Sequence, residues 1–285
     1  MSGGDFQSFY KTVESGEGDR CKYPTRLDTY GCGCQHNCAY CYARSLLDFR
    51  GLWNPAYPKE ADIKKIRRMI AWECLPGEIV RLGGMTDCFM PKERRRRITL
   101  RAIEALNHYR IGYLIVTKSD LVAAPEYLKA MDKSLAHIQI SVTSTDDAIS
   151  KRIEPGAALP EARIKAVETL QKEGFDVAVR LSPYIPEFVD VERIKRIECD
   201  KFQVEFLRVN SWIEKWLYGS GVNLAAYNYA EGGYKHLPLE VKKELLSRIQ
   251  RPGVEISICE DVTEHYNYWT ENFNPNKEDC CNLRK

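Results

Sequence analysis

The sequence predicts an α/β fold built on a parallel β-sheet, in which each strand is followed by a helix. Short apolar segments alternate along the chain with longer amphipathic segments, which is the pattern of repeated strand–helix units. The segment 113–117 is apolar at nearly every position, as expected of a strand that is covered on both faces. A chain of 285 residues falls in the range in which an α/β barrel forms one domain.

The composition is that of an ordinary globular protein. The formal net charge is +2 and 29% of the residues are charged. No apolar run approaches the ~18–20 residues of a membrane span, and the N-terminus lacks a charged-then-apolar signal pattern, so we expect a cytoplasmic protein. Eleven cysteines in such a chain favour metal ligation over a disulfide framework. The near-neutral charge neither requires nor excludes a nucleic-acid partner, because a local basic stripe is sufficient.

The expected elements follow from apolar spacing and from helix start and stop signals. Helices are expected where apolar residues recur at three- and four-residue intervals, and proline opens two of them, at Pro125 and Pro160. A further helix starts near Asp146. The expected strands are 26–30, 78–82, 113–117, 137–142, 177–181, 202–207 and 254–258. The expected helices are 39–49, 63–74, 92–108, 125–134, 160–174, 191–197 and 239–250.

A group of cysteines directly follows the first expected strand. Cys34, Cys38 and Cys41 have three and then two residues between them. Thiolates are soft ligands that select zinc, copper(I) or iron–sulfur clusters. A zinc site needs a fourth ligand, for which Cys32 and His36 are the candidates, but no second metal-binding pair follows. Three ligands on a four-iron cluster instead leave one iron open to a substrate.

With an aromatic residue just before the third cysteine, this motif resembles that of the radical S-adenosylmethionine (SAM) enzymes, and Tyr-Cys-Tyr at 40–42 resembles their spore photoproduct lyase-like branch. The resemblance covers about residues 26–207. It implies an incomplete parallel (β/α)6 barrel and a [4Fe–4S] cluster on Cys34, Cys38 and Cys41. It further implies that SAM binds the fourth iron and is cleaved to a 5′-deoxyadenosyl radical. A flavodoxin- or ferredoxin-like electron donor is the expected partner.

The same resemblance implies a set of SAM contacts at the strand ends. A glycine-rich turn after the second strand receives the SAM amino group, a lysine after the third pairs with its carboxylate, and later polar residues border the site. Two of these positions have simpler explanations. The lysine could be an ordinary surface residue, and the serine and threonine residues after the fourth strand could cap the N-terminus of the next helix. The implied SAM-binding residues are Gly83, Gly84, Thr86, Lys118, Ser141, Thr143 and Arg180.

Three residues are candidates for returning a hydrogen atom to the product. Tyr40 and Tyr42 flank the third cysteine, and their alternative role is to shield the cluster from water. Cys88 lies near the glycine turn, but spore photoproduct lyases carry their donor cysteine where this chain has Met85. Cys88 is therefore either a donor that approaches from another direction or an inert thiol. A donor would have to be exposed to the pocket.

Two stretches bear on the substrate. Residues 92–97 include four consecutive arginines, and residues 208–237 are rich in Trp and Tyr. If the arginines contact phosphates and the aromatic residues stack on bases, the substrate is a nucleic acid or nucleotide. If the arginines only form a solvated helix face and the aromatic residues a packed lid, a peptide or small-metabolite substrate remains open. Near the C-terminus, Cys259, Cys280 and Cys281 are candidate ligands of a second metal or cluster.

We therefore expect three parts: a lead-in over residues 1–24, the partial barrel over 25–207, and an aromatic-rich cover and tail over 208–285. The function implied is that of a lyase-like radical SAM enzyme. A non-catalytic zinc-binding or nucleic-acid-binding protein is the alternative from another class, and metal content distinguishes it from the enzyme.

Overall fold

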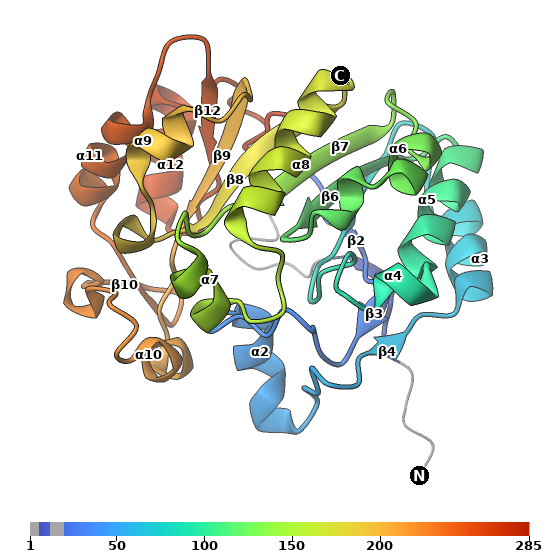
Figure 1. Ribbon diagram of the computed structural model, residues 1–285, viewed down its shortest axis with the longest axis horizontal. Coiled ribbons are helices and arrows are strands. Elements are labelled where there is room, and N and C mark those ends of the chain that lie inside the picture. The colour runs from blue at the N-terminus through green and yellow to red at the C-terminus, as the bar shows by residue number, and fades with distance from the viewer. Residues whose placement is uncertain (1–5, 12–19, 285) are drawn as a thin grey trace.

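A parallel sheet forms the centre of the computed structural model, which describes residues 6–11 and 20–284 (Figure 1). From β2 to β12 every neighbouring pair of its strands is parallel, and β1 joins the β2 edge in the antiparallel sense. The order of the strands is β1 (Phe9–Lys11), β2 (Thr25–Leu27), β5 (Ile79–Leu82), β6 (Gly112–Thr117), β7 (Ala136–Ser141), β8 (Asp176–Tyr184), β9 (Lys201–Phe206) and β12 (Glu255–Ile258). The expected α/β fold with an incomplete parallel barrel is confirmed.

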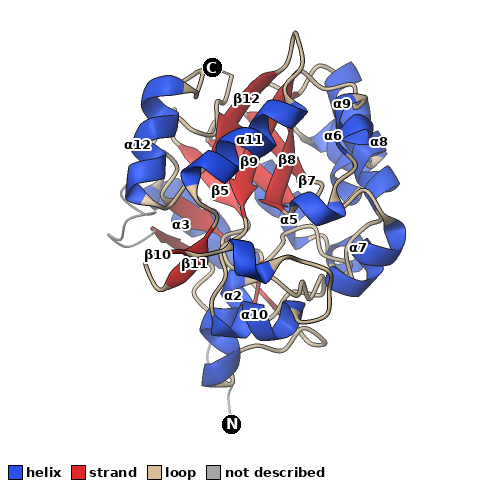
Figure 2. Cartoon of the chain, turned by 90° about the vertical axis from the view of Figure 1, so that its left-hand side faces the viewer, coloured by secondary structure: helices blue, strands red, loops and turns tan. Residues whose placement is uncertain are grey.

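Helices cover the outer face of this sheet (Figures 1 and 2). They pack through apolar stripes. In α3 (Ile63–Glu73) this stripe includes the buried Ile66 and Ile70, and the Asp62 side chain caps the N-terminus by accepting a hydrogen bond from the Lys64 amide. The C-terminal segment adds a further helix, α12 (Thr263–Asn272), after β12. The outer helices are α3 (Ile63–Glu73), α5 (Ile98–His108), α6 (Pro125–Ala130), α8 (Pro160–Lys172), α9 (Val191–Lys195) and α11 (Leu239–Ile249).

Short elements gather at the carboxyl ends of the strands, at the bottom of Figure 1. They follow or precede the loops that leave the sheet there, so they are placed to surround a site at this end. They are α2 (Tyr42–Leu47), α4 (Glu93–Arg96), α7 (Asp147–Ile153), α10 (Ser211–Leu217), the pair β3 (Tyr30–Gly31) and β4 (Lys59–Glu60), and the hairpin of β10 (Tyr229–Glu231) and β11 (Tyr234–His236). Among the described residues, no helix is long and apolar enough to cross a membrane.

The helix expected over 92–108 is wrong in one respect, because the chain breaks it into α4 and α5 at Arg97. This residue has a left-handed φ of 52°. The Glu93 carboxylate is fully buried and accepts hydrogen bonds from the amides of Thr99 and Leu100, at 3.1 and 3.0 Å. It thus satisfies amide groups in the first turn of α5, which a helix N-terminus leaves without intrahelical partners.

Candidate active site

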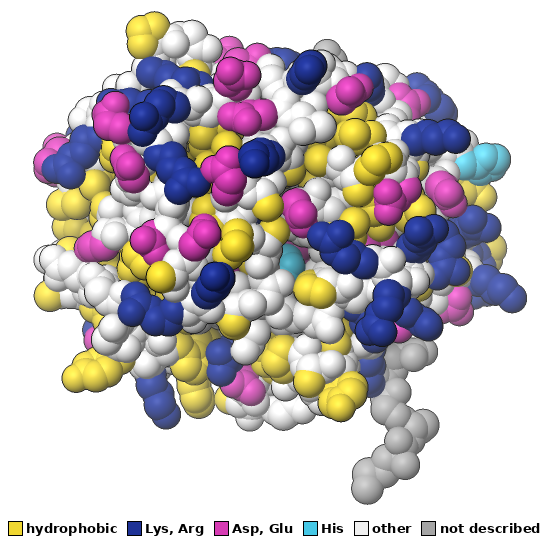
Figure 3. Space-filling model, in the orientation of Figure 1, with side chains coloured by type: hydrophobic (Ala, Val, Ile, Leu, Met, Phe, Trp, Pro, Cys, Tyr) yellow, Lys and Arg dark blue, Asp and Glu magenta, His cyan; other side chains and the backbone are white. Residues whose placement is uncertain are grey.

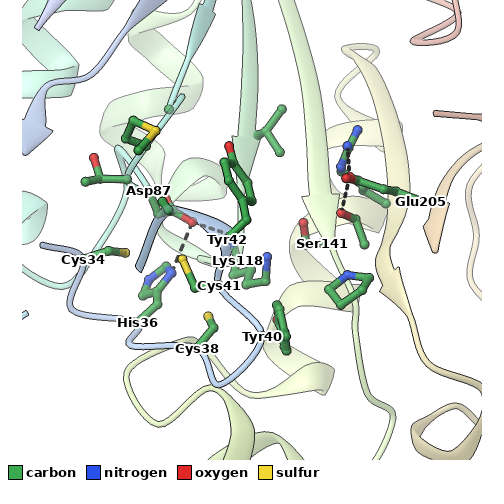
Figure 4. Close-up of a pocket in the computed structure, with 18 of the residues that line it drawn as sticks. Cys34, His36, Cys38, Tyr40, Cys41, Tyr42, Asp87, Lys118, Ser141 and Glu205 are labelled. Carbon is green, nitrogen blue, oxygen red and sulfur yellow. Dashed lines mark hydrogen bonds and ion pairs between the residues drawn. The ribbon is translucent and has the colours of Figure 1, made fainter. Parts of the chain in front are cut away.

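A pocket opens at the carboxyl ends of the strands, inside the cysteine loop (Figure 4). Its walls come from separate parts of the chain. They include the loop 34–43, the turn 83–87 after β5, Lys118 after β6, Ser141 on β7, Arg180 and Ser182 on β8, and residues 205–208 at the end of β9. The pocket therefore lies where barrel enzymes of this class hold their ligands.

Cys34, Cys38 and Cys41 all line this pocket, and Figure 4 shows their sulfur atoms near one another on its floor. Two local bonds fix the loop: the Ala39 amide donates to the Ile153 carbonyl at 2.8 Å, and the Cys41 thiol caps α2. Burial raises the pKa of Cys34 to about 12 and also raises the pKa of Cys38 and Cys41. Such desolvated thiols become stable thiolates when a cation binds them, so the loop fits an iron–sulfur cluster.

The zinc alternative finds less support in the geometry. His36 lines the pocket, but its Nδ1 atom lies 3.2 Å from the Asp87 carboxylate. Cys32 is not among the residues that line the pocket. A histidine that bonds a carboxylate through Nδ1 can still ligate a metal through Nε2, but among the described residues no group in this loop brings three ligand atoms within 4.8 Å of one another, as a single zinc ion would require.

Asp87 connects the cysteine loop to the strand ends. Besides His36, its carboxylate accepts hydrogen bonds from the Thr117 hydroxyl and the Lys118 amide, both at 2.8 Å, and from the Phe89 amide at 2.8 Å. Burial opposes ionisation of this carboxyl, but His36 and the amide donors lower its pKa to about 2. Asp87 is therefore ionised at neutral pH and holds three segments in register around the pocket.

The glycine turn lines the pocket as expected, and a buried carboxylate that sequence reasoning missed fixes its backbone. Asp28, just after β2, accepts from the amides of Gly84, Met85 and Thr86 at 2.9–3.2 Å. Gly83 has a φ of 84°, and a Cβ there would lie 2.9 Å from the Thr86 carbonyl oxygen. Only glycine suits this position. An acid at the end of the first strand is the signal that could have identified Asp28.

Asp28→Asn is expected to weaken SAM binding about tenfold or more, because an amide cannot accept from three converging N–H groups and the turn would shift. The measurement is the SAM dissociation constant of reconstituted protein by equilibrium dialysis. Asp62→Asn, which alters an exposed helix cap on α3, is the matched control and should bind SAM like wild type. Equal affinity in both variants would mean that Asp28 does not position the turn.

The remaining candidates divide into pocket residues and buried supports. Thr86, Lys118, Ser141 and Arg180 line the pocket with Gly83 and Gly84. Arg180 is held at 2.6 Å by both Glu205 and Gln139. Thr143 is not among the lining residues; it is fully buried behind Tyr40, and their hydroxyls lie 3.1 Å apart. The N-cap alternative for this Ser/Thr group is settled by Asp146, which caps α7 by accepting from the Ile149 amide at 2.8 Å.

Both tyrosines border the cysteine loop, in different settings. The Tyr40 hydroxyl donates to the buried Glu154 carboxylate, which pairs with the fully buried Arg163. Tyr42 donates to the Gly84 carbonyl at 2.6 Å, directly at the glycine turn. In Figure 4 the Tyr42 ring rises between the cluster loop and the strand ends. Glu154 and Arg163 thus form a buried support behind Tyr40.

The cysteines outside the loop are not brought to the pocket. Cys88 is 0% exposed and is not among the lining residues, because the turn directs it into the core. Cys259, Cys280 and Cys281 do not line the pocket either. Among the described residues, these three thiols do not form a group whose ligand atoms all lie within 4.8 Å of one another, so the structure does not bring them together as ligands of one metal ion.

Comparison with known proteins agrees with the geometry. The family model of the Radical SAM superfamily matches residues 29–198. An uncharacterised protein of Methanocaldococcus jannaschii is 30% identical over 171 residues, which are 57% of this chain and 61% of that protein. One of the Acidianus two-tailed virus is 23% identical over 208 residues, 68% of each chain. The chain thus spans about three-fifths of the length of the first of these relatives.

Solved structures show the same fold. A mutant spore photoproduct lyase superposes with a TM-score of 0.64 at 17% identity, over 85% of this chain and 78% of that one. SuiB of Streptococcus suis, bound to SAM, gives a TM-score of 0.51 at 14% identity, over 83% of this chain and 50% of SuiB. Family membership implies an iron–sulfur cluster and SAM as cofactors. The matched region contains the three-cysteine loop, and more than half of the sequence lies within it. The chain therefore belongs to the radical SAM superfamily.

Proposed function

We propose that this enzyme reductively cleaves SAM at a [4Fe–4S] cluster on Cys34, Cys38 and Cys41, and that the resulting 5′-deoxyadenosyl radical abstracts hydrogen from a nucleic acid or nucleotide. The observation that carries the first part is the convergence of three thiols, the glycine turn and Lys118 on one pocket. A flavodoxin- or ferredoxin-like protein supplies the electron.

The chain's own part is to hold and orient SAM. The Lys118 ammonium group lines the pocket and lies 5.6 Å from the centre of the Tyr40 ring, where it can pair with the SAM carboxylate. The glycine turn, fixed by Asp28, offers backbone groups to the SAM amino group. Glu205 neutralises Arg180 and also accepts from Ser182 at 2.7 Å, so the deeper wall of the pocket is a rigid polar network.

For hydrogen return to the product, Tyr42 is the better placed of the candidates. Its hydroxyl reaches the glycine turn in the pocket, and its ring is covered by Arg208 at 5.3 Å. Burial, with Cys38 and Glu154 nearby, raises the pKa of Tyr40 well above its usual value, so its O–H is retained. The Tyr40 hydroxyl donates to Glu154 and lies beside Thr143, which leaves Tyr40 the role of shielding the cluster. Cys88 is left out of the proposal because it is buried in the core.

The pocket rim supports a nucleic-acid substrate. Arginine and aromatic side chains alternate there: Arg44 lies 4.1 Å from the Trp216 ring, and Arg208 lies between the Tyr42 and Tyr234 rings, at 5.3 and 5.7 Å. Both arginines also pair with carboxylates, Arg44 with Asp48 at 3.6 Å and Arg208 with Glu205 and Asp261 at 3.3 and 3.2 Å. What these pairs offer a nucleic acid is therefore chiefly aromatic faces on which bases can stack. One solved spore photoproduct lyase, with a TM-score of 0.62 to this fold, is complexed with a dinucleoside spore photoproduct.

Substrate class is tested by stimulation of SAM cleavage. We expect 5′-deoxyadenosine formation by the reconstituted, dithionite-reduced enzyme to rise when single-stranded or duplex oligonucleotides are added, because substrate binding encloses the pocket. The readout is the 5′-deoxyadenosine formed per enzyme, and a peptide library at equal concentration is the control. A structure of SuiB bound to a precursor peptide also resembles this fold, with a TM-score of 0.51. Stimulation by peptides is therefore the competing expectation. Stimulation by peptides alone would overturn the nucleic-acid assignment.

A further inference from the structure

The first two turns of α3 carry a dense group of cations. Lys64, Lys65, Arg67 and Arg68 are all exposed. Within the described ranges, none of the four lies within 4.0 Å of a carboxylate oxygen. The buried residues of this helix, Ile66 and Ile70, face α5 and the sheet. Because that apolar stripe points inward, the cations are held on the outer surface.

The arginine run of α4 continues this surface. Arg94 pairs with Asp120 at 2.9 Å, and Arg96 pairs with Glu60 at 2.7 Å. Arg95 and Arg97 are exposed and form no ion pair within the part of the chain that the structure describes. Four consecutive arginines thus include two that are neutralised and two that are not. The cationic face is defined here as the exposed residues Lys64, Lys65, Arg67, Arg68, Arg95 and Arg97.

The cationic face adjoins the cysteine loop. Glu60 on β4 binds both Arg96 and Lys92, the latter at 3.0 Å, which ties α4 to the start of α3. The Lys92 amide donates to the side chain of Gln35 at 2.6 Å, and Gln35 follows the first cluster cysteine. Figure 3 shows Lys and Arg side chains gathered over α3, α4 and α5, on the right of the view. The face therefore extends outward from one side of the pocket.

The charge of this face is unlike that of the whole chain. The protein has a formal net charge of only +2, whereas the face has six cations that form no ion pair among the described residues. Trp72, one turn beyond Arg68 on α3, is 81% exposed and extends the face with an aromatic surface. An array of cations along a helix, with a stacking ring at its end, is complementary to a sugar–phosphate backbone.

We infer that the cationic face binds the phosphate backbone of a nucleic acid whose reacting nucleotide enters the pocket. The inference rests on the proposed nucleic-acid substrate and adds the surface that binds the flanking chain. Phosphate contacts carry no sequence information, but they fix the register of the bound strand. Each phosphate that a cation neutralises also makes binding depend more steeply on salt.

The experiment compares two variants that each remove four positive charges. The α3 variant carries Lys64→Gln, Lys65→Gln, Arg67→Gln and Arg68→Gln. The control variant carries Lys165→Gln, Lys172→Gln, Arg196→Gln and Arg248→Gln, which alters exposed cations at or beside α8, α9 and α11. Binding to fluorescein-labelled 20-nucleotide single strands and duplexes is measured by anisotropy over a series of salt concentrations. Thermal melting verifies that both variants are folded.

The α3 variant is expected to bind DNA at least tenfold more weakly in low salt. Its log–log salt slope for the duplex should be shallower by about 2–4, because each phosphate that the protein no longer neutralises reduces the slope by ~0.9. The control variant should change the slope by less than about 1. A general effect of net charge would move both variants equally and would overturn the inference.

Other outcomes separate this inference from the proposed function. If wild type binds DNA and the α3 variant binds it with the same slope, the face is not the backbone site, while the nucleic-acid substrate still stands. If wild type does not bind the oligonucleotides at all, the inference and the nucleic-acid part of the proposed function fail together, and only a nucleotide substrate still stands. If the α3 variant binds DNA like wild type but is reduced more slowly by an acidic flavodoxin, the cationic face binds the electron donor and the inference is overturned.

Discussion

Cys38→Ala is expected to lose most of the iron and sulfide that the wild-type protein takes up on anaerobic reconstitution. Cys38 is the middle of the three thiols and is buried at the pocket floor. Two remaining cysteines cannot hold a cluster that needs three protein ligands, and an alanine methyl group offers no replacement. The checks are chemical analysis for iron and sulfide and the visible absorption of the cluster.

Cys199→Ala provides the matched control for this experiment. Its thiol is also buried, but it contacts the backbone carbonyls of Val177 and Lys201, at 3.7 and 3.3 Å, and does not line the pocket. This variant should take up as much iron as wild type. Full iron loading of Cys38→Ala would show that the cluster is held by another set of cysteines.

Arg163→Leu is expected to destabilise the protein by about 3–5 kcal/mol, since it leaves the buried Glu154 carboxylate without its counterion. Both side chains are 0% exposed. Arg163 also donates to the carbonyls of Ser141 and Ala158, at 2.9 and 2.7 Å, and thus joins α8 to the end of β7. The measurement is the free energy of unfolding in urea at pH 7. Arg110→Leu breaks an exposed pair with Asp132 and should cost less than about 1 kcal/mol.

The effect of Arg163→Leu should depend on pH. Burial alone would raise the pKa of Glu154, but Arg163 and Lys118 bring it down to about 2. A carboxyl group whose pKa is lower in the folded state contributes stability above its unfolded pKa of about 4.3, and that contribution is lost as pH falls. Because the unfolded state is the same in both proteins, the difference between wild type and Arg163→Leu should be largest above the pKa that Glu154 has in the folded variant, which burial raises once Arg163 is gone, and should shrink as pH falls from there to about 2. A difference that stays constant down to pH ~2 would contradict this role of the pair.

The central strands and the cysteine loop could be predicted from the sequence because their signals are local. Segment 113–117 is apolar on both faces and becomes β6. The strand expected over 26–30 is split: β2 ends at Leu27, and Tyr30 belongs to β3, which pairs with β4 outside the main sheet before the cysteine loop begins. The spacing of Cys34, Cys38 and Cys41 already requires one short loop. Strand ends in a parallel sheet meet at one edge, so Lys118 and Ser141 could be placed at the pocket in advance.

The errors and omissions concern interactions between distant segments. The break at Arg97 depends on the direction of the Glu93 side chain, which no helical periodicity encodes. The direction of Cys88 is set by how the turn packs in three dimensions. Asp28 supports the glycine turn from 56 residues away, and Tyr40 meets Glu154 across 114 residues. A single sequence contains no spacing rule for such pairs.

Cleavage of SAM in the three-cysteine pocket is the step on which the proposed function depends. It is tested by the formation of 5′-deoxyadenosine by anaerobically reconstituted wild-type protein given SAM and dithionite, with Cys38→Ala in parallel. We predict that the nucleoside forms with wild type and is absent with the variant. If a fully iron-loaded wild-type protein forms none, even with oligonucleotides or peptides added, the pocket does not carry out radical SAM chemistry and the proposed function is wrong.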